Sequence, residues 1–112
     1  MTQKIKPKRV IIFIDENGNE PYINWLNRLK DQKTKERIKI RVRRLESGLY
    51  GDYKAVGEGV LELRMFFGAG YRVYIGEDGE NIVILLLGGD KGSQKQDIEI
   101  AKLYWKEYKE NG

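Results

Sequence analysis

An uninterrupted apolar run in the C-terminal third, IVILLL at residues 82–87, constrains the fold of this chain more than any other feature. The run does not alternate between apolar and polar positions, so we expect a strand that is covered on both faces and lies centrally in a sheet. It ends at Gly88 and Gly89, and Asp90 and Lys91 follow at once. The two glycines permit a sharp turn and the close approach of another molecule. The alternative is that they only form the turn from a strand into a helix.

The chain has the length and composition of one folded domain. Its 112 residues are 40% hydrophobic and 34% charged, which fits a single core over residues 1–112. It contains no cysteine and no histidine. Disulfides, thiolate metal sites, zinc enzymes and histidine-dependent catalytic triads are therefore excluded. We expect neither a metal nor a cofactor.

The charge balance is mildly basic, with 21 basic and 17 acidic residues and a net charge of +4. Such a balance suits an acidic partner, either nucleic acid or an acidic peptide, but it also suits ordinary solubility. No segment approaches the roughly 20 apolar residues of a membrane span. The apolar residues 10–14 are too few for the core of a signal peptide. We therefore expect a cytoplasmic protein without a membrane partner.

The N-terminal half is predicted to contain one strand and two helices. Residues 10–14 are typical of a short buried strand, and Asn19 and Pro21 then suit the cap and the first turn of a helix. A second helix is expected over residues 34–46, with Gly48 as its stop, so that the two helices form an antiparallel hairpin. The apolar face of the first helix consists of Tyr22, Trp25, Leu26 and Leu29.

The C-terminal half is predicted to form a small sheet closed by a helix. Residues 48–59 hold four glycines and are expected to form a loop, either irregular throughout or with one short strand-like segment. The last helix begins near Ser93, which has the capping-box spacing to Gln96. Its buried stripe is expected to consist of Ile98, Ala101, Trp105 and Tyr108. The expected class is α+β, in the order β-α-α-β-β-β-α, with a small twisted antiparallel sheet. Its last three strands are expected over residues 60–67, 71–75 and 82–87.

Two arginines are expected to face each other across the hairpin formed by residues 60–75. Glu62 and Arg64 share one face of their strand, and Arg72 and Tyr74 share a face of the next. A three-residue loop centred on Gly68 would place Arg64 opposite Arg72. Facing like charges destabilise a sheet by up to roughly 1 kcal/mol, which makes sense if a polyanion binds between them. The alternative is that Glu62 neutralises one arginine and solvent screens the other.

Lys91 lies just before the expected N-terminus of the last helix. Free N–H groups and the helix dipole favour an anion at such a place. The segment GGDKGS lacks the spacing of a phosphate-binding P-loop, so no nucleotide site is predicted.

Several ordered segments of the chain resemble one protein family. They are FIDENGNEPYINWLNRL, DYKAVGEGVLELR, GYRVY and GGDKGSQ, and together they span nearly the whole sequence. They are similar to the RelE/ParE superfamily of bacterial toxins, and most similar to its HigB-like branch of addiction module killer proteins. The resemblance implies a RelE-like fold and the toxin of a type II toxin–antitoxin module. It also implies a cognate antitoxin, HigA-like and with a helix-turn-helix domain.

Many RelE-like toxins cleave messenger RNA in the decoding site of the ribosome, without a metal. The resemblance places the basic active-site positions of the family on Arg64, Arg72 and Lys91. A histidine near the active site of some relatives is missing here. The remaining candidates are proton carriers, Glu62 and Asp90, and residues that contact RNA, namely Lys54, Tyr74, Arg41 and Arg44.

Three functions remain open from the sequence. In a ribosome-dependent endoribonuclease, the three cations would stabilise the phosphorane formed when a 2′-hydroxyl attacks the adjacent phosphate. A ParE-like toxin would instead inhibit DNA gyrase, through the helical hairpin and the termini. An inactive module would only bind RNA or protein, and its aromatic side chains could stack on bases. Those aromatic residues are Phe66, Phe67, Tyr71 and Tyr74.

Overall fold

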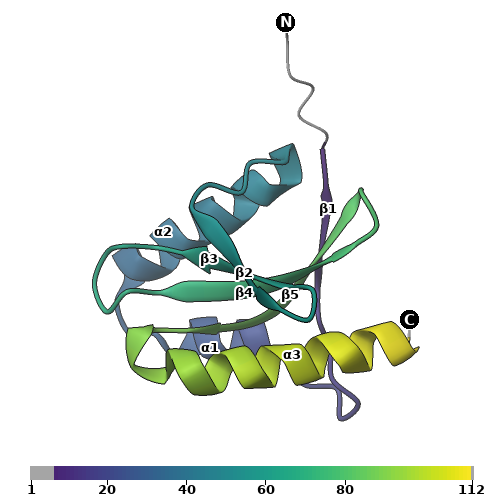
Figure 1. The fold of residues 1–112 in the computed structure, drawn as a ribbon. Coiled ribbons are helices and arrows are strands. Elements are labelled where there is room, and N and C mark those ends of the chain that lie inside the picture. Colours follow the sequence, from purple (N-terminus) through teal and green to yellow (C-terminus); the bar gives the residue numbers. More distant parts are fainter. Residues whose placement is uncertain (1–6, 112) are drawn as a thin grey trace, which may run out of the picture.

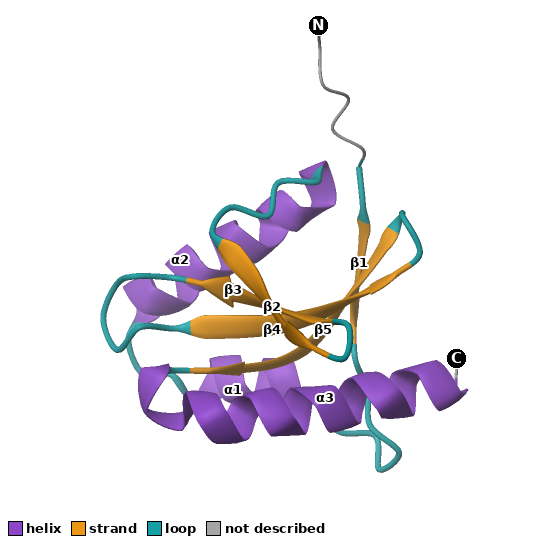
Figure 2. Ribbon diagram, viewed as in Figure 1, coloured by secondary structure: helices purple, strands orange, loops and turns teal. Residues whose placement is uncertain are grey.

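Five strands form one twisted sheet in the order β1-β5-β4-β3-β2, with three helices around it (Figures 1 and 2). This computed structural model describes residues 7–111. The strands are β1 (Arg9–Ile12), β2 (Tyr53–Gly57), β3 (Val60–Arg64), β4 (Arg72–Asp78) and β5 (Ile82–Gly89). The helices are α1 (Pro21–Arg28), α2 (Gln32–Arg43) and α3 (Gln94–Asn111), and single 3-10 turns, η1 (Arg44–Ser47) and η2 (Lys91–Ser93), follow α2 and precede α3. The α+β class is confirmed.

The sheet is mixed, and the expectation of a purely antiparallel sheet was wrong. β1 pairs with β5 in parallel, from Arg9 opposite Ile82 to Ile12 opposite Leu85. The other three pairings are antiparallel. β2 is the short strand-like segment that the sequence allows within the loop expected over residues 48–59. Its pairing with β3 shifts register between Ala55 and Gly57, and this irregularity hides the two-residue period of a strand.

β5 is the central strand that the apolar run predicts. It lies between β1 and β4, α1 packs on one of its faces and α3 on the other. Gly88 and Gly89 do not make a turn, since both belong to the strand. A Cβ on Gly88 would lie 2.0 Å from the Trp25 ring, and one on Gly89 would lie 1.9 Å from Oδ2 of Asp97. The glycines therefore leave room for α1 and α3 to pack against β5, and not for the approach of another molecule.

Each face of the sheet has its own core. On one face, α1 and α2 pack against β3, β4 and β5, with Trp25, Ile38 and Leu45 buried. On the other face α3 places Ala101 and Trp105 on the sheet, as the sequence predicts. The residues that complete the α3 stripe, Ile98 and Tyr108, are half-buried.

The predicted caps of two helices need correction. Glu20, not Asn19, precedes α1, because the N–H of Asn19 donates to the Asp15 carboxylate in a tight turn. Pro21 does occupy the first turn as expected. The capping box near α3 consists of Asp90 and Ser93, in place of the pair that begins at Ser93. The chain therefore enters α3 through the η2 turn.

The end of α2 agrees with the sequence. Gly48 has a φ of +77°, a left-handed conformation that glycine adopts freely, and it ends the η1 turn that follows α2. The start of α2 lies two residues before the expected position, because Asp31 accepts a hydrogen bond from the N–H of Thr34. Across residues 7–111, no helix combines the length and apolar content needed to cross a bilayer.

Alkaline pH is expected to weaken the fold through Tyr22. This side chain is buried beneath α1, and burial raises the pKa of Tyr22 from 10.0 to about 12. The unfolded chain ionises first, so the contribution of Tyr22 is complete below pH 10 and is lost between pH 10 and 12. The loss at pH 11 is about 1 kcal/mol. Urea-unfolding midpoints at pH 8 and 11 measure it, and Tyr22→Phe should remove this part of the shift. An equal shift in both proteins would contradict the prediction.

Candidate functional site

Arg64 and Arg72 lie directly opposite each other at the end of the β3–β4 hairpin, which confirms the register expected from the sequence. Two pairs further along, Glu62 lies opposite Tyr74. Because residues two apart share a face, both arginines lie on the face that carries Tyr74 and α3. The strands thus bring two of the three predicted catalytic cations to one place.

Each of the two facing arginines has an acidic neighbour. Nε of Arg72 lies 3.6 Å from Oε2 of Glu62, and Nη2 of Arg64 lies 3.3 Å from Oδ1 of Asp52. Nη1 of Arg72 also donates to the carbonyl oxygen of Gly70 at 2.6 Å. Glu62 therefore neutralises Arg72, as the alternative interpretation of the facing arginines supposes. The charge of Arg64, which that interpretation left to solvent, is neutralised by Asp52. These contacts hold the Arg72 guanidinium in a buried position, whereas the pairing of Arg64 with Asp52 lies at the surface.

Glu62 is the centre of a buried network. Its side chain is fully enclosed, and its Oε2 accepts hydrogen bonds from Tyr74 Oη at 3.0 Å and Gln94 Nε2 at 2.9 Å. Burial and the Glu62 carboxylate raise the pKa of Tyr74, which keeps its hydroxyl protonated as a donor. The prediction that Tyr74 contacts RNA was wrong, because its ring is fully buried. The enclosed Glu62 carboxylate is likewise not exposed as a proton carrier; its structural role is to hold Arg72.

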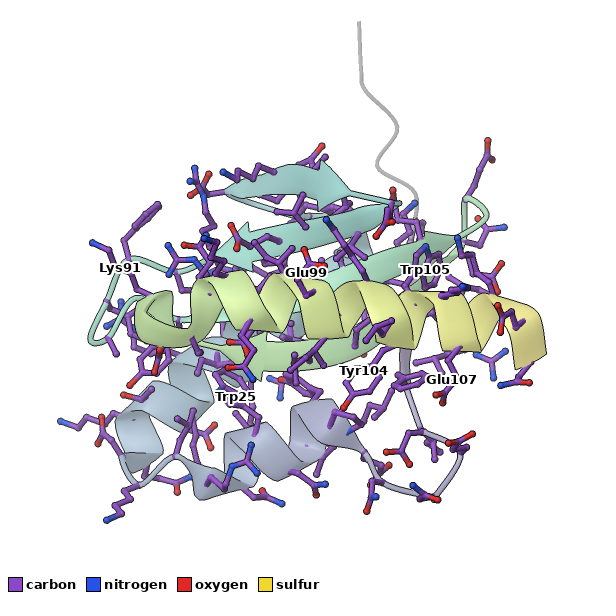
Figure 3. The ribbon with its side chains drawn as sticks, turned by 60° about the horizontal axis from the view of Figure 1, so that its bottom comes forward. Trp25, Lys91, Glu99, Tyr104, Trp105 and Glu107 are labelled. Carbon is purple, nitrogen blue, oxygen red and sulfur yellow. The ribbon has the colours of Figure 1, made fainter. Side chains whose placement is uncertain are left out.

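Lys91 joins the arginines from the η2 turn. Its Cβ and the Nη1 of Arg72 each lie 3.4 Å from the point that a Cβ on Gly70 would occupy. The Lys91 backbone N–H approaches the carbonyl oxygen of Ala69 at 3.4 Å, which ties η2 to the β3–β4 loop. The Lys91 side chain is exposed at the N-terminal end of α3 (Figure 3). The backbone and Cβ of Lys91 therefore lie beside the β3–β4 loop, which Arg64 and Arg72 flank.

Asp90 occupies the anion position that the sequence predicts at this helix start. Its Oδ1 accepts hydrogen bonds from the backbone N–H groups of Gly92 and Ser93, at 2.9 and 3.2 Å. The expectation that free N–H groups here favour an external anion was wrong, because a carboxylate of the chain itself binds them. Asp90 is half-buried in this cap. Its carboxylate therefore caps the helix start, and it is not the free proton carrier that the sequence predicts.

Two of the residues predicted to contact RNA differ sharply in their surroundings. Lys54 is exposed on the edge strand β2 and lies opposite Glu62, so it shares the face of the two arginines. Arg41 instead donates to the carbonyl oxygens of Tyr50, Asp52 and Arg64, at 2.7, 2.6 and 2.7 Å. Burial lowers the pKa of Arg41, and its donors are used to fasten α2 to the end of β3.

A basic groove of about 420 Å³ opens beside the arginine pair, between α2 and the end of β3. Arg37, Arg41 and Arg44 line it from α2 and η1, and Arg64 and Phe66 line it from the hairpin. Arg44 is exposed and forms no ion pair within the described part of the chain. Arg37 was not predicted. It lies four residues before Arg41 and seven before Arg44, the spacing of one helical face, and this spacing is the signal that identifies it.

Acidic side chains within residues 7–111 do not cluster as a metal ion would require. What this end of the molecule offers is positive charge: Lys54, Arg64 and Lys91 near the loop, and Arg37 and Arg44 along the groove. Such an arrangement can bind and polarise a phosphodiester.

Comparison with known proteins gives one informative relative. No family model matches the chain. A protein of Haemophilus influenzae (strain ATCC 51907 / DSM 11121 / KW20 / Rd), described as an uncharacterized protein, is 48% identical over 80 residues. The match covers 71% of this chain and 81% of that protein. On this identity and coverage, the chain belongs to the same family as the H. influenzae protein.

Proposed function

We propose that the chain is the toxin of a type II toxin–antitoxin module, a HigB-like member of the RelE/ParE superfamily with a RelE-like fold. In this proposal it is a metal-independent, ribosome-dependent endoribonuclease that cleaves messenger RNA in the cytoplasm and so inhibits translation. The observation that carries the proposal is the convergence of Arg64, Arg72 and Lys91 around one loop. The resemblance of the sequence to this family adds independent support.

The proposed reaction is an internal transesterification of RNA. The 2′-hydroxyl loses its proton as its oxygen forms a bond to phosphorus, the bond from phosphorus to the 5′-oxygen breaks, and that oxygen takes up a proton. The products carry a 2′,3′-cyclic phosphate and a 5′-hydroxyl. The pentacoordinate intermediate carries more negative charge on its oxygens than the substrate does. Cations that contact those oxygens therefore stabilise the transition state over the ground state. Arg64, Arg72 and Lys91 take this role.

The acidic neighbours of the arginines suit this role. Arg72 is 9% exposed and is held by buried Glu62 and by the Gly70 carbonyl, so little reorganisation is needed when charge develops beside it. Arg64 is paired with Asp52, which is exposed and so can be displaced by a phosphate. Arg72 thus supplies a fixed charge, and Arg64 a charge that binds substrate in exchange for Asp52.

The partners in this proposal are the ribosome with its messenger RNA, and a cognate HigA-like antitoxin with a helix-turn-helix domain. The antitoxin neutralises the toxin in the cell. An open reading frame for such a protein beside the gene of this chain is therefore expected.

The test is cleavage of messenger RNA on programmed ribosomes by the purified chain. We expect truncated messages whose new 5′ ends carry a hydroxyl, and no such products when ribosomes are omitted. Gyrase supercoiling, measured with the same preparation, should be unchanged. Intact messages together with inhibited supercoiling would reject the proposal in favour of a ParE-like toxin, and intact messages with normal supercoiling would indicate a binding module.

A further inference from the structure

Phe66, in the loop between β3 and β4, presents its ring to solvent from a well-anchored piece of backbone. Its exposed fraction is 75%, whereas Met65 before it is 5% exposed. The N–H of Met65 donates to the carbonyl oxygen of Tyr71 at 2.9 Å, and the N–H of Gly70 donates to that of Phe67 at 3.0 Å. The loop is thus closed by hydrogen bonds on both sides, and the ring of Phe66 is held outward.

The neighbouring ring, Phe67, shows how the loop is fixed to the rest of the molecule. The guanidinium of Arg37 lies 3.8 Å from the Phe67 ring centroid, and the Tyr71 ring lies 5.6 Å from it. Phe67 is therefore enclosed between α2 and its own hairpin. The chain has two adjacent phenylalanines, of which one anchors the loop and the other contributes little to the core.

A single exposed apolar side chain is common in soluble proteins and by itself indicates nothing. Phe66 differs because cations surround it. The Arg64 guanidinium lies 5.5 Å from the Phe66 ring centroid, and the basic groove with Arg37 and Arg44 begins at the same place. An exposed aromatic ring beside a positively charged groove is the combination with which proteins bind single-stranded nucleic acid, since bases stack on the ring and phosphates follow the cations.

We propose that Phe66 is a stacking platform for one nucleobase of single-stranded RNA, and that Arg37 and Arg44 contact the phosphates of the same strand. The inference rests on the proposed function, which supplies the path of the RNA across this surface. Arg64 borders both the arginine pair and the groove, so RNA whose phosphate lies at Arg64 and Arg72 continues past Phe66. An acidic peptide would also be attracted by the arginines, but its carboxylates do not stack on an aromatic ring.

The experiment measures equilibrium binding of the full chain to a single-stranded 2′-O-methyl RNA octamer, by fluorescence anisotropy. Methylation blocks the attacking hydroxyl, so the probe stays intact. Phe66→Leu keeps an apolar side chain without an aromatic ring, and Phe66→Tyr keeps the ring. We expect the leucine variant to bind about tenfold or more weakly, and the tyrosine variant to stay within about threefold of the wild type. Both changes are at an exposed position, so folding is not at stake.

A second series locates the stacked base. Octamers that each lack one base are compared on wild type and on Phe66→Leu. At one position the loss from the missing base and the loss from leucine should fail to add, because both remove the same contact. Equal affinity of wild type and Phe66→Leu for the intact octamer would overturn the inference. So would a polyglutamate peptide whose affinity falls as much as that of RNA on the same substitution, since the platform would then serve a peptide.

The two proposals fail in different ways. Binding that depends on Phe66, without any cleavage on ribosomes, would leave the stacking platform in place and reject the endoribonuclease. Cleavage on ribosomes with binding that is indifferent to Phe66→Leu would reject the platform and support the enzyme.

Discussion

Removal of both facing arginines is expected to slow messenger RNA cleavage on ribosomes by at least about 100-fold, since loss of even one preorganised donor to a developing anion costs 10²–10³ in rate. Arg72 cannot simply be truncated, because buried Glu62 would then be left as an uncompensated charge, at a cost of about 3–5 kcal/mol. The informative variant therefore combines Arg64→Ala with Arg72→Gln and Glu62→Gln. It removes the cations and the buried carboxylate together.

The matched control is Arg43→Ala, an exposed arginine on α2 that lies outside the groove and the pair. Its cleavage rate should be unchanged. Circular dichroism must show the same folded spectrum for both proteins. If the folded triple variant cleaves RNA and arrests growth as fast as the control does, the cations do not perform the reaction.

Gly88→Ala is expected to destabilise the fold by about 3 kcal/mol, because the added methyl group overpacks the interface between β5 and α1. The added carbon would lie 2.0 Å from the ring of Trp25, so α1 must move away from β5 or the ring must change rotamer. Urea-unfolding midpoints measure the loss.

The partner substitution Trp25→Leu makes this prediction specific. A smaller side chain at position 25 leaves room for the methyl group, so Gly88→Ala should cost much less in the Trp25→Leu background than in the wild type. Such a difference is the non-additivity expected of two groups in contact. An equal cost in both backgrounds would show that the clash with the ring is not the cause.

The parts of the fold that depend on neighbours in sequence could be predicted. The pairing of Arg64 with Arg72 follows from strand alternation and a short loop. The central place of β5 follows from six consecutive apolar residues, and the α3 stripe follows from helical spacing. Each of these depends on a pattern within about 20 residues, where the geometry of strands and helices leaves few alternatives.

The parts that depend on distant segments could not be predicted. The parallel partner of β5 is β1, more than 70 residues earlier, and no local pattern specifies it. The glycines at the end of β5 looked like a turn because their contacts, Trp25 and Asp97, come from two different helices. The same holds for the candidate site. Tyr74 and Glu62 alternate with apolar residues as a solvent-exposed pair would, and only the position of α3 shows that they are buried.

The hydrogen bonds of Arg41 couple the position of α2 to that of Arg64 in the candidate site. Three of its donor bonds reach carbonyl oxygens in residues 50–64, including that of Arg64, and so fasten α2 to the end of β3. A displacement of α2 is therefore transmitted to the Arg64 backbone. If the proposed reaction takes place, a molecule that binds only the outer side of α2 would shift Arg64 relative to the phosphate, and would slow cleavage without covering the site.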